Sequence, residues 1–206
     1  MIPVTPKQEP GDFDIKVRQK GLKFLKTTPR PRGSEWIRKE YWRKCIPELQ
    51  TSYDNICAYC AIKIPAHTGD PTVDHYISRD VDPSLAYEWA NFRLAARRFN
   101  SRKLNYTIVD PFTVQYGWFV LDFRTYLIHP NNQPNFLDSN QYSLVDFTIR
   151  KLKLNIDDNL VQARLGIIRD YVKNKVQFSY LQENAPFIAY ELGRQNLVHT
   201  IQSWNV

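Results

Sequence analysis

The chain has 206 residues, of which 43% are hydrophobic and 24% are charged. This size suits one compact catalytic unit with an extension, with two small lobes as the alternative. A formal net charge of +7 and an aromatic content of 14% favour a polyanionic partner such as DNA or RNA, although most aromatic side chains are expected to fill the core. Three cysteines are too few for a secreted disulfide framework, and the sequence shows neither a signal peptide nor a membrane-spanning apolar run. We therefore expect a soluble, cytoplasmic protein with no membrane contact.

The first 33 residues are rich in proline and carry the basic run KVRQKGLKFLKTTPRPRG. This composition predicts an arm that is extended or only partly ordered. Its cations would neutralise phosphates if the arm lies along nucleic acid, and a solvated tail is the alternative. These cations are Lys16, Arg18, Lys20, Lys23, Lys26, Arg30 and Arg32.

The next segments predict a ββα arrangement. EWIRKEYWRKC, after Ser34, has apolar residues on one helical face, which predicts a helix that ends near Pro47. CAYCAIKI predicts a Cys-x-x-Cys turn and a short apolar strand. The strand TVDHYI follows, then a loop interrupted by Asp82-Pro83, and then NFRLAARRF, a strand expected to pass into a helix at NSRKL. This order of strand, loop, strand and helix is typical of compact catalytic units.

The remainder of the chain predicts two short strands within GWFVLDFRTYLI and helices from Ser143 onward. Asp157 and Asp158 are expected to cap a long middle helix, and Pro186 to open the last helix. The apolar stripe of the middle helix consists of Leu160, Leu165, Ile168, Val172 and Val176. We therefore divide this α+β chain into a basic arm at 1–33, a central domain at 34–130 that contains the ββα arrangement, and a helical lobe at 131–206.

The central domain contains an Asp74-His75 pair, which is followed by Asn91 and by Asn100 within the basic stretch RRFNSRK. These residues predict a nuclease. Phosphodiester hydrolysis requires a base for water, a cation for the charge on the phosphate, and positive side chains that hold the backbone. An imidazole can accept the proton, and carboxylate and amide oxygens are suitable ligands for Mg²⁺ or Mn²⁺. Nearby cations are expected to bind phosphates, with a solvated surface as the alternative: Arg79, Arg97, Arg98, Arg102 and Lys103.

Strand geometry imposes a condition on this site. Adjacent residues of a strand face opposite sides of the sheet, so Asp74 and His75 reach one substrate only if the strand is twisted or the following helix folds back. The site hypothesis therefore requires that both side chains and Asn100 share one cavity.

The motif resembles that of the HNH endonuclease superfamily, whose fold is a ββα-metal unit. The matching residues are CAYC, Asp74-His75, Asn91, Asn100 and Lys103. The resemblance implies that His75 is the general base. It implies that Asn91 braces the loop and orients His75. It also implies that Asp74 and Asn100 are the metal ligands.

The sequence departs from that family at a second Cys-x-x-Cys, where Ala96 and Phe99 stand instead. Because a structural zinc site needs four ligands, Cys57 and Cys60 supply only half of one, and His67 could add a third. We therefore expect no structural Zn²⁺, with apolar packing in its place and a vestigial or shared zinc site as the alternative. A redox role is disfavoured, because no thioredoxin-like βαβ pattern surrounds the two cysteines.

The order of segments over about residues 54–112 is also similar to the HNH subunit of the Septu anti-phage system and related bacterial defence nucleases. The similarity rests on YEWANFRLAARRFNSRK, on DPF at residues 110–112 and, more loosely, on LKLNIDDNLVQAR. It implies cleavage of DNA in anti-phage defence under the control of an ATPase subunit. The alternatives are a stand-alone nuclease, a catalytically silent subunit that binds nucleic acid or a partner, and a ribonuclease with the same site.

Overall fold

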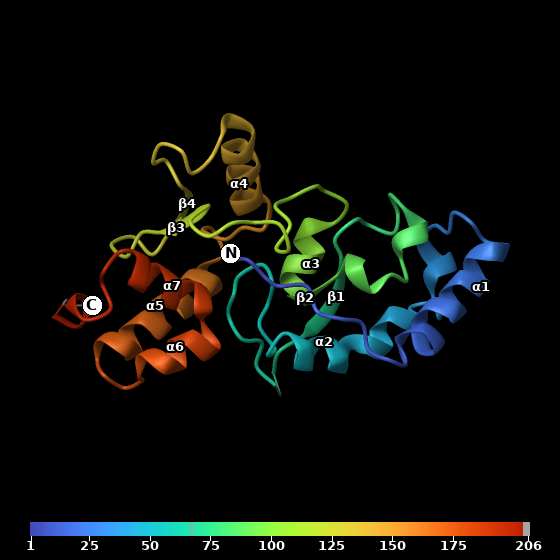
Figure 1. Cartoon of the computed structure of the whole chain (residues 1–206), viewed down its shortest axis with the longest axis horizontal. Helices are drawn as coiled ribbons and strands as arrows, with labels where there is room; N and C mark the ends of the chain where they lie inside the picture. The colour runs from blue at the N-terminus through green and yellow to red at the C-terminus, as the bar shows by residue number, and fades with distance from the viewer. Residues whose placement is uncertain (67, 204–206) are drawn as a thin grey trace. The chain divides into compact units, whose positions relative to one another are not determined.

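The computed structural model describes residues 1–66 and 68–203 (Figure 1). Helices alternate with small antiparallel sheets, which confirms the predicted α+β class. The chain divides into two units: an N-terminal unit of Thr5–Cys57 and Ile64–Thr107, and a C-terminal unit of Met1–Val4, Ala58–Lys63 and Ile108–Val206. Most of the predicted arm thus belongs to the N-terminal unit, and the second unit takes up the chain at Ile108 rather than at residue 131. None of the helices described is long and apolar enough to span a bilayer.

The centre of the N-terminal unit is a two-stranded antiparallel sheet followed by a helix. Strand β1 (Pro71–His75) pairs with β2 (Phe92–Ala96), with His75 opposite Phe92 in the register. Helix α3 (Arg97–Lys103) begins directly after β2 and packs on both strands. The predicted order of strand, loop, strand and helix is confirmed. CAYCAIKI, however, forms turns rather than the predicted strand.

The predicted extended arm is wrong over residues 14–27, which are helical. A π-helical turn at Asp14–Arg18 continues into α1 (Gln19–Thr27). The helix docks through Gly21, because a Cβ atom there would lie 2.1 Å from the ring of Tyr87. Burial of apolar surface therefore orders a segment whose composition alone predicts disorder.

Salt bridges also change the expected role of two cations in this segment. The ammonium of Lys16 lies 3.1 Å from Glu48, and the guanidinium of Arg18 lies 3.0 Å from Glu88. Lys16 and Arg18 therefore hold the helix on the unit rather than serving as free phosphate ligands.

The predicted single helix from residue 34 to Pro47 is also wrong. Two 3₁₀ helices at Gly33–Trp36 and Tyr41–Cys45 precede α2 (Ile46–Ser52). Pro47 lies in the first turn of α2, where its missing N–H has no intrahelical partner to lose. The proline therefore marks the start of a helix rather than the end of one.

The C-terminal unit contains the predicted pair of short strands and a set of helices. Strand β3 (Phe119–Leu121) pairs with β4 (Ile128–Pro130). The helices are α4 (Ser139–Lys151), α5 (Asp158–Val172), α6 (Phe178–Asn184) and α7 (Pro186–Arg194), with a 3₁₀ turn at Thr200–Ser203. Pro186 opens α7, and the Asp157 carboxylate caps α5 by accepting the Leu160 N–H, as predicted. Val176 lies beyond α5, so the predicted apolar stripe is shorter than expected.

Candidate active site

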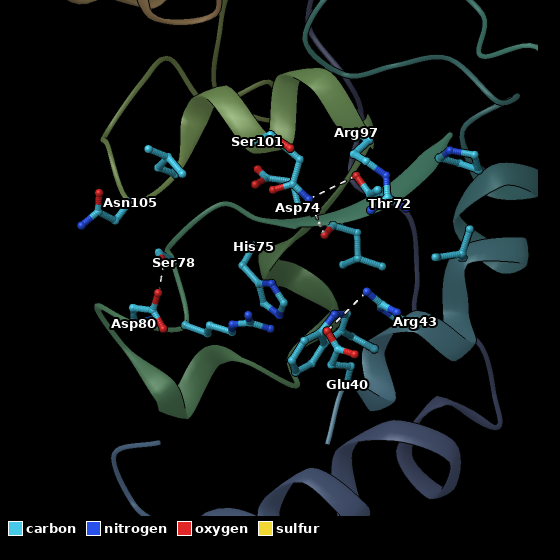
Figure 2. A pocket seen from close by; sticks show the side chains of 17 residues that line it. Glu40, Arg43, Thr72, Asp74, His75, Ser78, Asp80, Arg97, Ser101 and Asn105 are labelled. Carbon is cyan, nitrogen blue, oxygen red and sulfur yellow. Dashed lines mark hydrogen bonds and ion pairs between the residues drawn. The ribbon is translucent and has the colours of Figure 1, made fainter. Parts of the chain in front are cut away.

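Asp74, His75 and Asn100 line one cavity of about 640 Å³ in the N-terminal unit (Figure 2). Strand β1 presents Asp74 on the side of α3 and the His75 ring on the other side, as strand alternation requires. The cavity reaches both side chains, because α3 folds back along β1. The geometric condition set by the sequence is therefore met.

The carboxylate of Asp74 lies beside a buried ammonium. Lys103 Nζ is 3.4 Å from both Asp74 carboxylate oxygens and donates a 2.7 Å hydrogen bond to the His75 carbonyl. The side chain of Lys103 is 0% exposed, and that of Asp74 is 3% exposed. This corrects the predicted role of Lys103, because a fully buried ammonium cannot reach a phosphate at the surface. Lys103 instead holds the end of β1 through one side chain and one backbone group.

Asn100 is oriented by two hydrogen bonds. Its Nδ2 donates to Thr72 Oγ1 at 3.1 Å and to the Val73 carbonyl at 3.0 Å. Both amide hydrogens are thereby used, which leaves the carbonyl oxygen Oδ1 as the atom that can bind a cation. Because Asp74 lies on the same side of β1 as α3, one carboxylate and one amide oxygen form the hard donor set of the cavity.

The tautomer of His75 follows from its hydrogen bond. His75 Nε2 lies 2.9 Å from the Ala86 carbonyl, which can only accept, so Nε2 carries the proton and Nδ1 keeps its lone pair. The rings of Trp42 and Phe92 meet the imidazole edge to face, with centroid distances of 4.7 and 5.2 Å.

The pKa of His75 is lowered to about 4, chiefly by burial between these rings. The hydrogen bond to Ala86 opposes this shift, and the positive charges of Arg79 and Lys103 contribute to it. The ring is therefore neutral at physiological pH and able to accept a proton at Nδ1.

Asn91 joins the two ends of the loop between β1 and β2. Its Oδ1 accepts the Ile77 N–H at 2.8 Å, and its Nδ2 donates to the carbonyls of Ile77 and Leu85 at 2.9 and 3.2 Å. The side chain is buried and does not line the cavity. Since Ala86, the partner of His75, directly follows Leu85, Asn91 is placed as a positioning residue.

Two of the predicted phosphate-binding arginines line the cavity. The guanidinium of Arg79 lies 5.1 Å from the ring of Trp36 and 4.9 Å from that of Trp42. Burial lowers the pKa of Arg79, which remains a cation. Among the residues described, none hydrogen-bonds its guanidinium, so its donors are available to an anion. Arg97 also lines the cavity and forms a surface ion pair with Asp70.

The other two predicted arginines lie outside the cavity. Arg98 is exposed on α3, and Arg102 lies over the ring of Phe99, 5.9 Å from its centroid. They can meet nucleic acid only beyond the cavity.

Among the residues of the cavity wall that the sequence did not predict are three that precede β1 by about 30 residues. Glu40, Trp42 and Arg43 reach the site from the 3₁₀ helix at Tyr41–Cys45 and the turn before it. Arg43 is exposed and lies 3.4 Å from the Glu40 carboxylate. Their only sequence signal is the aromatic and basic string EYWRKC, which does not indicate contact with a strand that begins at Pro71.

The cysteine pair gives no metal site that can be assigned. Cys57 is buried in the N-terminal unit, where the Ala96 N–H points at its sulfur from 3.5 Å. Within residues 1–66 and 68–203, no three histidine, cysteine, aspartate or glutamate side chains form a group that could hold a metal. His67, the predicted third zinc ligand, lies outside the described residues, so the zinc prediction stays a prediction.

Comparisons with known proteins do not assign this chain to a family. No family model matches the chain, and no curated protein or solved structure is significantly similar to it. The cavity itself and the sequence motif are therefore the grounds on which a function is proposed.

Proposed function

We propose that this protein is a metal-dependent endonuclease of the HNH type that hydrolyses phosphodiester bonds of DNA. One observation carries the proposal: Asp74, His75 and Asn100 line the same cavity. The HNH core, the catalytic activity and the substrate are inferred from this arrangement together with the motif resemblance.

His75 is the general base in this proposal. Its Nε2–H is fixed on the Ala86 carbonyl, so Nδ1 is the nitrogen that takes a proton from the attacking water. A pKa of about 4 keeps the ring neutral, although it makes the imidazole a weaker base than an unperturbed histidine. A divalent cation held by Asp74 and Asn100 would offset this weakness, since a divalent metal ion lowers the pKa of the water bound to it.

The donors present fit Mg²⁺ or Mn²⁺. Asp74 supplies a carboxylate and Asn100 supplies Oδ1, and Mg²⁺ is commonly held by one or two protein oxygens, with waters and substrate phosphate completing its shell. Lys103 Nζ lies 3.4 Å from both Asp74 carboxylate oxygens, and an ammonium at this distance favours the charged form of a buried carboxylate. When bound, the cation neutralises charge on the phosphate and leaving oxygen.

Arg79 and Arg97 hold the substrate backbone in this proposal. Arg79 is preorganised by two indole rings and has its donors directed at no carboxylate, so it can bind a phosphate oxygen without breaking a salt bridge. Arg97 forms an ion pair with Asp70 that must open before Arg97 binds a phosphate. Because the pair is exposed, opening it costs little free energy.

The biological setting is proposed from the segment order alone. By similarity to Septu-type nucleases, we propose that the protein acts in bacterial anti-phage defence, in the cytoplasm, with a regulatory ATPase partner. The C-terminal unit is where we place the contact with that partner, because its helices carry no part of the cavity.

Plasmid cleavage tests the proposal. Purified protein incubated with supercoiled DNA and Mg²⁺ or Mn²⁺ is expected to nick or linearise the plasmid, and His75→Ala is expected to abolish this activity. His129→Ala is the matched control, since His129 is exposed and lies in the other unit. Binding without cleavage by the wild type would support the silent subunit, and cleavage of RNA in place of DNA would support the ribonuclease.

A further inference from the structure

A second cavity adjoins the candidate active site in the N-terminal unit. It has a volume of about 580 Å³ and lies between residues 29–33 and residues 80–84. Asp80 lines both this cavity and the one that contains His75, so the loop after β1 is a wall that the two cavities share. A polymer strand bound at His75 can therefore continue into the second cavity.

The first wall contains two arginines. Pro31 is buried, whereas Arg30 and Arg32 are exposed. Arg32 has an extended backbone, with φ −131° and ψ 143°, whereas Arg30 lies in a bend of the chain. Both arginines line the cavity.

Packing of the flanking segments holds the wall of residues 29–33 in place. Helix α1 precedes this wall and is docked on Tyr87 through Gly21. Phe24 of α1 packs against Trp36, which follows the wall in the chain, with ring centroids 5.8 Å apart. Two prolines at 29 and 31 further restrict the backbone, which lowers the entropy lost when a ligand binds. The Arg32 N–H donates to the Glu35 carboxylate at 2.8 Å, and in the part of the chain that the structure describes neither the Arg30 nor the Arg32 guanidinium forms a salt bridge.

The opposite wall is acidic and equally well braced. Asp82 accepts the N–H and the hydroxyl of Ser84 at 3.0 and 2.6 Å, and Asn91 ties together the two ends of the loop. The carboxylate of Asp80 is exposed, and Val81 next to it offers an apolar side chain that is 62% exposed. The cavity thus has donors and positive charge on one side, and acceptors with apolar surface on the other.

We propose that this second cavity binds one unpaired nucleotide of the substrate strand, next to the scissile phosphate; the proposal rests on the nuclease function proposed above. The arginines take the phosphate, since a phosphate would be repelled from the acidic wall. The base then faces Asp80, where carboxylate oxygens accept hydrogen bonds from an exocyclic amino group such as that of cytosine. A volume of about 580 Å³ suits a ligand of this size, and a paired base could not turn its edge into it.

Binding of short oligonucleotides in EDTA tests this proposal without requiring cleavage. Fluorescently labelled single-stranded dC₁₀ and dT₁₀ and a duplex of the same length are titrated with the full-length protein. Arg30→Ala/Arg32→Ala is expected to weaken single-strand binding about tenfold and to reduce the slope of log K against log salt by about 0.7, the value for the one phosphate that both arginines hold. Arg169→Ala/Lys173→Ala is the matched control, because it removes the same charge from exposed positions of the C-terminal unit, outside the cavity.

The base readout uses a second variant. Wild-type protein is expected to prefer dC₁₀ to dT₁₀, and Asp80→Asn is expected to remove that preference. Equal weakening by the two double variants, or a wild type that binds duplex as tightly as single strand, would overturn the proposal. The two hypotheses can fail separately. If cleavage depends on His75 but the arginine variant shows no selective loss of single-strand binding, only the nucleotide site in the second cavity is refuted. If the arginine variant shows that selective loss but the wild type cleaves no DNA, only the nuclease function is refuted.

Discussion

Lys103 and Asp74 form an ion pair beneath the candidate active site, with Nζ 3.4 Å from both carboxylate oxygens. The pair links the last residue of α3 to the strand that carries His75. Because the Lys103 ammonium also donates to the His75 carbonyl, one buried cation fixes both a proposed metal ligand and the backbone of the proposed base.

Breaking this pair is expected to destabilise the protein. Lys103→Met leaves the Asp74 carboxylate buried without its cation, so the free energy of unfolding should fall by about 3–5 kcal/mol. Urea denaturation monitored by tryptophan fluorescence measures the change. Lys103→Met/Asp74→Asn should recover part of the loss, and Lys20→Met, at an exposed position, should leave stability unchanged. A Lys103→Met protein as stable as the wild type would show that the pair is not buried.

The neutral His75 predicts how stability depends on pH. Its folded-state pKa of about 4 lies below the ordinary value of 6.5, so the unfolded chain binds more protons between these two values. Stability due to the neutral ring is complete above pH 6.5 and is lost as pH falls toward 4, by up to about 3 kcal/mol. Urea denaturation from pH 4 to pH 7 measures it, with His75→Gln as the reference. Parallel curves for the two proteins would contradict the lowered pKa.

The same pKa predicts the pH profile of cleavage. If His75 acts as the base, kcat/KM should not fall around pH 6.5, where an ordinary histidine becomes protonated, but only as pH approaches 4. Initial rates of plasmid nicking in Mg²⁺ between pH 5 and pH 8 measure this, with folding checked at each pH. A half-maximal rate near pH 6.5 would mean that the imidazole is solvated in the working enzyme.

Asn91→Ala should lower activity without removing a catalytic group. The change leaves the Ile77 N–H and the carbonyls of Ile77 and Leu85 without their partner, at a cost of about 1–3 kcal/mol in the free energy of unfolding. The cleavage rate should fall while the affinity for Mn²⁺ stays near that of the wild type. Asn132→Ala, in an exposed loop, is the control. A loss of Mn²⁺ affinity as large as that of a ligand variant would reassign Asn91 to the metal.

Metal binding distinguishes two asparagines of the same cavity. Asn100→Ala should weaken Mn²⁺ binding, because it removes the oriented Oδ1. Asn105→Ala removes an exposed amide that makes no hydrogen bond to the residues described, so it should have little effect. Electron paramagnetic resonance of free Mn²⁺ during titration gives both affinities without any turnover. Equal affinities in the two variants would exclude Asn100 as a ligand.

Local patterns predicted the elements that carry the site. The alternation in TVDHYI, the break at Asp82-Pro83 and the change of period at NSRKL correspond to β1, the loop, and the passage from β2 to α3. The N-cap Asp157 of α5 and the first residue of α7, Pro186, could also be predicted, because each acts within one helical turn. Local chemistry was sufficient wherever the determining contacts lie close in sequence.

Long-range burial explains the failures. Phe13 packs on Phe92, with ring centroids 5.9 Å apart, and this contact helps to order the segment that composition predicted to be extended. Lys103 was grouped with the exposed arginines because a lysine in RRFNSRK looks the same whether its ammonium faces water or a buried carboxylate. Trp42 and Arg43 reach the cavity through packing of a 3₁₀ helix on β1, for which no short sequence pattern exists.

The rate at which wild-type protein and His75→Ala nick supercoiled plasmid in Mg²⁺, at equal concentration and with equal melting temperatures, tests the central claim most directly. Loss of the general base should lower the rate about 100-fold or more, while His129→Ala keeps the wild-type rate. Equal rates for wild type and His75→Ala, or no cleavage of DNA by the wild type with any of the divalent cations named, would contradict the assignment of Asp74, His75 and Asn100 as a nuclease site.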